Sequence, residues 1–122
     1  MDKYYDVMER LLELLNTLEE GILHIQSQLK ELQYEEALFI LQDVMEGIAS
    51  IENALEPMAS NLAKNNIKEL ENDLITAIAK TVASYEQENE INLEKQIEQG
   101  VTPTFMRWKE EIEGILQPYI IS

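Results

Sequence analysis

The sequence contains no cysteine, and only four of its 122 residues are glycine and three are proline. Without cysteine, the chain has no disulfide, no thiolate metal ligand and no cysteine nucleophile. Basic residues are scarce as well, because nine Lys and Arg stand against 24 Asp and Glu, for a formal net charge of −15. A surface of this sign repels phosphate backbones and anionic lipids, so we expect neither nucleic acid nor a membrane as a partner.

Long apolar runs are also missing. The longest, residues 37–41, is much shorter than the roughly 20 residues that a membrane-spanning helix needs. The first residues mix charged and aromatic side chains, whereas a secretory signal has a basic start followed by an apolar core. We therefore expect a cytoplasmic protein with one domain over residues 1–122, since a domain usually takes roughly 100 to 200 residues.

The apolar residues recur at helical spacing in four segments, each predicting an amphipathic helix with one apolar face. The first face has the most regular spacing, with alternating steps of four and three: Tyr4, Met8, Leu11, Leu15, Leu18, Ile22, Ile25, Leu29 and Leu32. The second face is Tyr34, Leu38, Leu41, Met45, Ile48, Ile51 and Leu55. The third is Ile67, Leu70, Leu74, Ile78, Val82 and Tyr85, and the fourth is Ile97, Val101, Phe105, Trp108, Ile112, Ile115 and Tyr119.

These faces predict helices over roughly 3–32, 34–56, 66–88 and 91–117. Proline lacks a backbone donor, so Pro57 is expected to stop or kink the second helix. Pro103 interrupts the fourth, which is either one kinked helix or two collinear pieces, with Thr102 in the position of an N-cap.

The fold predicted from these helices is an all-α, antiparallel four-helix up-down bundle, because short connections make neighbouring helices run in opposite directions. No segment alternates apolar and polar residues as a half-buried strand does. The alternative is a long helical hairpin that dimerises into a bundle, since the regular face of the first helix is equally suited to packing on a second chain.

Residues for catalysis or metal binding are sparse. His24 is the only histidine, and Glu20 lies four positions before it, so the Glu-x-x-His pattern of di-iron bundles is not present. The sequence has no Gly-x-Ser-x-Gly elbow, no glycine-rich phosphate loop and no EF-hand loop. Its paired glutamates occur where a helix shows polar residues to water. We expect no enzyme activity, no cofactor and no metal.

The apolar residues outside the four faces indicate a contact surface for another protein. Phe39 projects opposite the second apolar face and Ile40 lies on its flank, while Leu12 and Leu23 belong to a second line on the first helix. Residues 34–64 contain six acidic residues and one basic residue. The predicted partner-binding residues are Phe39, Ile40, Asp43, Glu46, Leu12 and Leu23. In the competing interpretation these are ordinary scattered surface residues.

Three segments carry a resemblance to known proteins: Tyr4–Met8, Tyr34–Leu38 and Met45–Glu52. They resemble a group of small, acidic, all-helical proteins of unknown function from Bacillus-type bacteria. The Tyr-Glu-Glu-Ala-Leu helix start is similar, more loosely, to flagellar export chaperones and helical-repeat adaptors. The resemblance implies an all-helical fold and assigns no residue a role.

The function we expect is a non-enzymatic protein–protein interaction module, an adaptor or small chaperone that binds an apolar or basic helical segment against its acidic flank. Two alternatives remain open at this point. One is a structural homodimer whose exposed apolar lines are buried by symmetry, and the other is an acidic decoy that occupies a basic protein.

Overall fold

The computed structural model describes residues 2–87 and 92–120, and within them the chain is all-helical, with no strand. The elements in chain order are η1 (Asp2–Tyr4), α1 (Tyr5–Lys30), α2 (Tyr34–Leu55), η2 (Glu56–Asn61), α3 (Ile67–Glu86), α4 (Leu93–Gln96), η4 (Ile97–Val101) and α5 (Thr102–Ile120). The four predicted helices are therefore present, the fourth as the consecutive segments α4, η4 and α5. The predicted ends at residues 88 and 91 lie outside the described residues.

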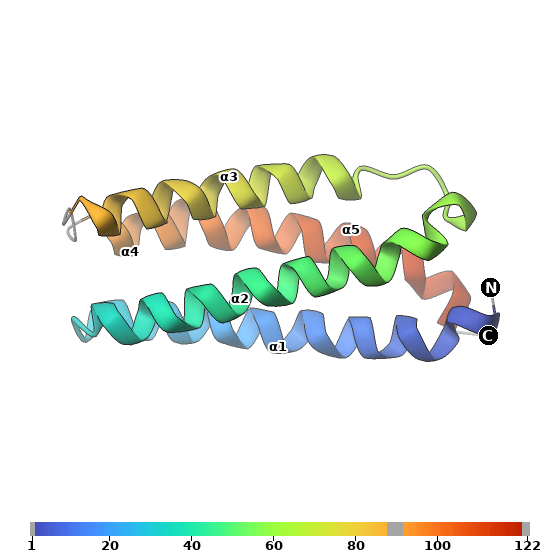
Figure 1. The fold of residues 1–122 in the computed structure, drawn as a ribbon, viewed down its shortest axis with the longest axis horizontal. Coiled ribbons are helices and arrows are strands. Elements are labelled where there is room, and N and C mark those ends of the chain that lie inside the picture. Colours follow the sequence, from blue (N-terminus) through green and yellow to red (C-terminus); the bar gives the residue numbers. More distant parts are fainter. Residues whose placement is uncertain (1, 88–91, 121–122) are drawn as a thin grey trace.

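The four helical rods lie side by side along the long axis of the molecule (Figure 1). In this view α1 and α2 form the lower pair, and α3 and the rod of α4 and α5 form the upper pair. Side-chain bonds tie the rods together: Gln26 of α1 donates to Thr102 of α5 at 2.7 Å, and the Tyr4 hydroxyl donates to the Pro57 carbonyl at 3.1 Å. None of the described helices has the length and apolar character needed to cross a membrane.

The apolar face predicted for α1 is buried from Met8 to Leu29. The prediction for Leu32 is wrong, because its side chain is 69% exposed and its backbone has a positive φ of 62°. Two bonds close α1 here, from Gln33 N to the Gln28 carbonyl (2.8 Å) and from Leu32 N to the Leu29 carbonyl (3.1 Å). This is a Schellman motif, in which the residue in the left-handed conformation turns out of the helix.

The buried face of α2 is rotated relative to the prediction. Ala37 and Val44 are buried, whereas Leu38 is half-buried and Met45 is 44% exposed. The prediction for Met45 is therefore wrong. The cause is the close packing of α2 on α1, where a glycine of each helix, Gly47 in α2 and Gly21 in α1, faces a side chain of the other. Pro57 acts as expected, since α2 ends at Leu55 and the 3-10 helix η2 follows.

The buried faces of α3 and α5 include two charged residues that the apolar pattern does not contain. Glu71 and Thr81 are buried in α3, where Leu70, Val82 and Tyr85 are only half-buried. In α5, Lys109 and Leu116 are buried, while Ile115 and Tyr119 are half-buried. The other positions predicted for these two faces are buried, and they are Ile67, Leu74, Ile78, Ile97, Val101, Phe105, Trp108 and Ile112.

Pro103 neither kinks a regular α-helix nor separates two helices. The rod continues from α4 through η4, a single π-helical segment, into α5. Thr102 is itself helical (φ −59°, ψ −50°), so it is not an N-cap. A proline in a regular helix clashes with the carbonyl four residues before it, and a wide turn before the proline relieves that clash. The Thr104 hydroxyl donates to the Gly100 carbonyl at 2.8 Å.

Candidate interaction surface

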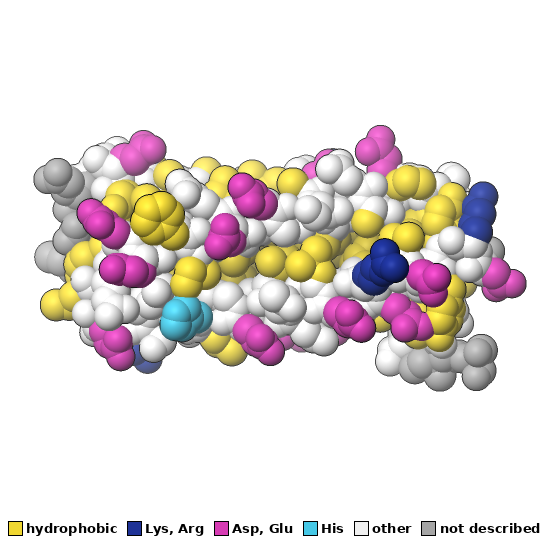
Figure 2. Space-filling view, turned by 60° about the horizontal axis from the view of Figure 1, so that its bottom comes forward, with side chains coloured by type: hydrophobic (Ala, Val, Ile, Leu, Met, Phe, Trp, Pro, Cys, Tyr) yellow, Lys and Arg dark blue, Asp and Glu magenta, His cyan; other side chains and the backbone are white. Residues whose placement is uncertain are grey.

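The outward side of α2 combines an exposed aromatic ring with acidic side chains. Phe39 is 67% exposed, and Asp43 and Glu46 are exposed at positions four and seven residues further along the chain. Residues at these spacings share one side of a helix. All five charged residues of α2 are acidic. On the face of the molecule that includes α1 and α2, apolar side chains form a band with acidic side chains on both sides of it (Figure 2).

The structure does not bring all six predicted residues together. Ile40 is half-buried on the side of α2 that faces α1, where its Cγ2 would lie 3.7 Å from a Cβ on Gly21. Leu23 is 50% exposed but lies two residues beyond Gly21, which is about 200° around the helix and away from α2. It follows Glu19, whose carboxylate pairs with Lys109 of α5, by one helical turn.

Leu12 is half-buried and also lies on the α5 side of α1, because it precedes Glu19 by seven residues, which is about two turns. Phe39, Asp43 and Glu46 thus form one surface, with Ile40 at its border with α1. Leu12 and Leu23 belong to a different flank of the molecule.

A furrow between α2 and α3 is a feature that the sequence pattern did not reveal. A cavity of about 190 Å³ lies there, lined by Met45, Ile48, Ala49, Glu52, Ile75, Ile78 and Ala79. Ile48 and Ile78 are buried beneath it, whereas Met45 (44%) and Ile75 (46%) are exposed at its edges. The signal in the sequence is Ile75, an apolar residue outside the third apolar face. Met45 gives no such signal, because the periodic pattern places it on the buried face of the second helix. We call this feature the α2–α3 furrow.

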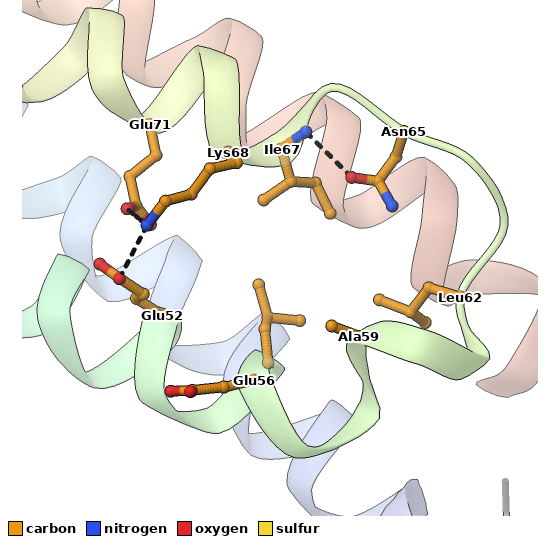
Figure 3. A pocket seen from close by; sticks show the side chains of 9 residues that line it. Glu52, Glu56, Ala59, Leu62, Asn65, Ile67, Lys68 and Glu71 are labelled. Atoms are coloured by element: carbon orange, nitrogen blue, oxygen red, sulfur yellow. Dashed lines mark hydrogen bonds and ion pairs between the residues drawn. The ribbon is translucent and has the colours of Figure 1, made fainter.

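At the η2 end of the furrow a second cavity opens, of about 340 Å³, and Glu52 borders both cavities. Figure 3 shows that Glu52 and Glu56 approach it from the side of α2 and η2, and Lys68 and Glu71 from α3. Apolar side chains, among them Leu55, Leu62 and Ile67, line the remainder. The start of α3 is fixed locally, because Asn65 Oδ1 accepts the Ile67 N–H at 3.0 Å and Glu111 of α5 accepts the Asn66 N–H at 2.8 Å.

Lys68 links two carboxylates across the mouth of the furrow. Its Nζ lies 2.9 Å from Glu52 Oε1 and 3.4 Å from Glu71 Oε2 (Figure 3). The Lys68 side chain is 71% exposed, whereas the Glu71 side chain is only 3% exposed. Burial, followed by the neighbouring Glu52 carboxyl, raises the pKa of Glu71 above its ordinary value. The hydrogen bond from Lys68 lowers the pKa of Glu52.

The side chains exposed on this surface are mainly apolar or acidic. Among residues 2–87 and 92–120, no group of three or more His, Cys, Asp and Glu side chains is arranged to hold a metal ion. His24 is exposed on α1. The exposed apolar side chains and the carboxylates of α2 and α3 are suited to contacts with a complementary protein surface.

A family model described as "Domain of unknown function (DUF8042)" matches residues 6–111, which include nearly all of α1 and the whole of α2 and α3. The chain belongs to this family. Membership agrees with the resemblance to helical proteins of unknown function, and it supports neither a bacterial source nor a likeness to export chaperones. The chain matches no curated protein and no solved structure.

Proposed function

We propose that the protein is a non-enzymatic interaction module, an adaptor or small chaperone, that binds a basic amphipathic helical segment of a partner protein along α2. One observation carries this proposal: α2 exposes Phe39 on one edge and Met45 on the other, and each of its charged residues is acidic. Aromatic and methionine side chains are typical anchors of protein interfaces. The carboxylates favour lysine and arginine on the partner.

The sign of the charge supports a basic partner over a second copy of this chain. Each copy has a formal net charge of −15, so two copies brought together along α2 repel one another. A basic segment is attracted by the same field, and its apolar side then covers side chains that water now contacts. The proposal includes the cytoplasmic location and the antiparallel four-helix up-down bundle expected from the sequence. The alternating course of the rods in Figure 1 supports the bundle.

The test uses three synthetic peptides of equal length. The first has leucines at helical spacing with lysine at the polar positions, the second has glutamate in place of lysine, and the third keeps lysine but has serine in place of leucine. Titration is followed by fluorescence anisotropy at low and high salt. We expect binding of the first peptide only, with an affinity that falls as salt rises.

Each peptide also tests an alternative. Equal binding of the serine peptide would indicate an acidic decoy that needs no apolar contact. Binding of the glutamate peptide, or of none of the three, would contradict the proposed function. Sedimentation equilibrium over a dilution series examines the homodimer: we expect a monomer mass throughout, and a stable dimer would contradict the proposal that α2 is open to a partner.

A further inference from the structure

The α2–α3 furrow exists because α2 and α3 are each packed tightly against a different helix. α2 lies against α1, where Gly47 adjoins the Leu18 side chain. α3 is held to the α4–α5 rod at both ends, through Glu111 beside Asn66 and through the Gln96–Ser84 bond of 2.8 Å. Between α2 and α3 the described residues form one polar bridge, the Lys68–Glu52 ion pair.

The middle of the furrow is apolar and concave. Ala49 and Ala79, one from each helix, contribute only a methyl group where larger side chains would fill the space, and the cavity of about 190 Å³ lies there. Glu52 belongs both to this cavity and to the larger one bordered by η2. The open part therefore extends from Met45 towards η2.

The η2 end of the furrow is acidic. Three carboxylates border the cavity there, those of Glu52, Glu56 and Glu71, and Lys68 is the one cation among the lining residues. Among the described residues Glu56 forms no ion pair, and the Lys68 side chain, which pairs with the other two carboxylates, is exposed to water. A cation that enters from outside meets an excess of negative charge at this end.

We propose that the α2–α3 furrow is the seat of an amphipathic helix of a partner protein, which lies with its apolar side on Met45, Ala49, Ile75 and Ala79 and with a lysine or arginine at its η2 end beside Glu52 and Glu56. The inference rests on the proposed function and decides which edge of α2 is used. Met45 and Glu56 are eleven residues apart, about 17 Å at 1.5 Å per residue. A partner helix of three turns, with its basic residue two to three turns from its first apolar residue, fits this span.

The charges at the η2 end favour a basic helix over a second copy of this chain as the occupant. A second copy would bring its own excess of carboxylates to an end that already has three. The α2 segment of a second copy has no basic residue to place there, because its charged residues are all acidic. The apolar part of the furrow alone does not distinguish these occupants, and the acidic end does.

The experiment measures binding of the lysine–leucine peptide to the full chain and to three variants. Met45→Gln and Ile75→Gln remove apolar contact from the two edges of the furrow without adding charge. Phe39→Gln tests the competing seat on the other edge of α2. All three positions are at least 44% exposed, so the variants are expected to fold, which circular dichroism and thermal melting check. Methyl NMR of the wild-type chain locates the bound peptide through the Met45 and Ile75 signals.

We expect Met45→Gln and Ile75→Gln each to weaken binding by about fivefold to tenfold, and Phe39→Gln to change it less than twofold. The Met45 and Ile75 methyl signals should shift on titration. If Phe39→Gln weakens binding and the furrow variants do not, the furrow inference is overturned, while the proposed function stands with its seat on the other edge of α2. If the peptide does not bind the wild-type chain, both the inference and the proposed function fail.

Discussion

Gly47 of α2 lies so close to Leu18 of α1 that a methyl group on the glycine would overlap the leucine side chain and come within 3.2 Å of its Cγ. On the facing helix, a methyl group on Gly21 would lie 3.3 Å from Val44 Cγ2. The two glycines let α1 and α2 approach closely, which turns Val44 and Ala37 into the core and leaves Met45 at the edge of the furrow. The tight interface on one side of α2 thus sets the open furrow on its other side.

Replacing Gly47 with alanine should destabilise the protein. Alanine is the better helix former by about 1 kcal/mol, but overpacking costs about 1–3 kcal/mol, so we expect a net loss of about 1 kcal/mol in the free energy of unfolding. Gly114→Ala is the control, because a methyl group at Gly114 meets nothing within 4 Å. It should stabilise the protein by about 0.5–1 kcal/mol in urea unfolding. A stabilising Gly47→Ala would show that Leu18 can move aside.

Replacing Leu32 with glycine should stabilise the turn between α1 and α2. A Cβ is sterically unfavourable at the φ of 62° that Leu32 adopts. Because the Leu32 side chain is exposed, its packing does little to offset this strain. We expect the free energy of unfolding, measured by heat or urea, to rise by about 0.5–1 kcal/mol. This value already allows for the greater conformational entropy of glycine in the unfolded chain. Leu32→Ala retains the Cβ and should show no gain; equal gains for both substitutions would contradict the argument.

Lys109 is a nearly buried cation whose removal should cost stability. Its Nζ lies 3.0 Å from Glu113 and 3.3 Å from Glu19 of α1. Burial lowers the pKa of Lys109, but the hydrogen bonds to these carboxylates outweigh it and raise the pKa above its ordinary value of 10.5. The stabilisation is therefore complete at neutral pH and is lost as pH rises through the folded-state pKa.

Lys109→Met keeps most of the side-chain volume and removes the charge. Glu19 and Glu113 are about one-third exposed and regain water, so we expect a loss of about 1–2 kcal/mol at pH 7, below that of a fully buried pair. Arg107→Met is the matched control, since Arg107 is exposed and forms no ion pair among the described residues. It should change the free energy of unfolding by less than about 0.5 kcal/mol. Similar losses in both variants would argue against a specific role for the Lys109 pairs.

Glu71→Gln should raise stability at pH 7, and the gain should shrink on acidification. Because burial raises the pKa of Glu71, the folded state binds the proton more tightly than the unfolded state does. The wild-type protein therefore becomes more stable, through this group, as pH falls through the folded-state pKa, until the unfolded chain is protonated near 4.5. Urea unfolding of both proteins between pH 4 and pH 8 gives the difference. A constant difference would show that Glu71 is not the titrating group.

The helices themselves follow from the sequence because their signals are local. The face of α1 was predicted correctly from Met8 to Leu29 because its apolar residues recur in alternating steps of four and three, whereas the second line, with Leu12 and Leu23, is sparse. The face of α2 was predicted in part, since Leu41, Ile48, Ile51 and Leu55 are buried as expected. The prediction missed Ala37 and Val44, because each stands directly beside another apolar residue, Leu38 or Met45. Which of these apolar residues is buried depends on the close contact between Gly47 of α2 and Leu18 of α1.

The buried charges and the furrow were missed for a related reason. The sequence pattern assigns Glu71 and Lys109 to the surface, because it does not show that Glu52 of α2 lies close to Glu71 or that Glu19 of α1 pairs with Lys109. Phe39 was predicted to project outwards from its angle on one helix alone, and it is exposed. To predict the α2–α3 furrow, one must know which two neighbouring helices do not pack tightly against each other. The periodic pattern of apolar residues does not contain this information.

The π segment before Pro103 gives the last rod one residue more than a regular helix would hold. The core positions Leu93, Ile97, Val101 and Phe105 are spaced by four throughout, and removal of one residue from the Ile97–Val101 segment would restore alternating steps of four and three up to Trp108. Such a deletion would also return the Pro103 ring to a collision with the preceding turn. The extra residue and Pro103 are therefore coupled: deleting the residue is tolerated only when the proline is also replaced. We expect related chains that lack one of them to lack both.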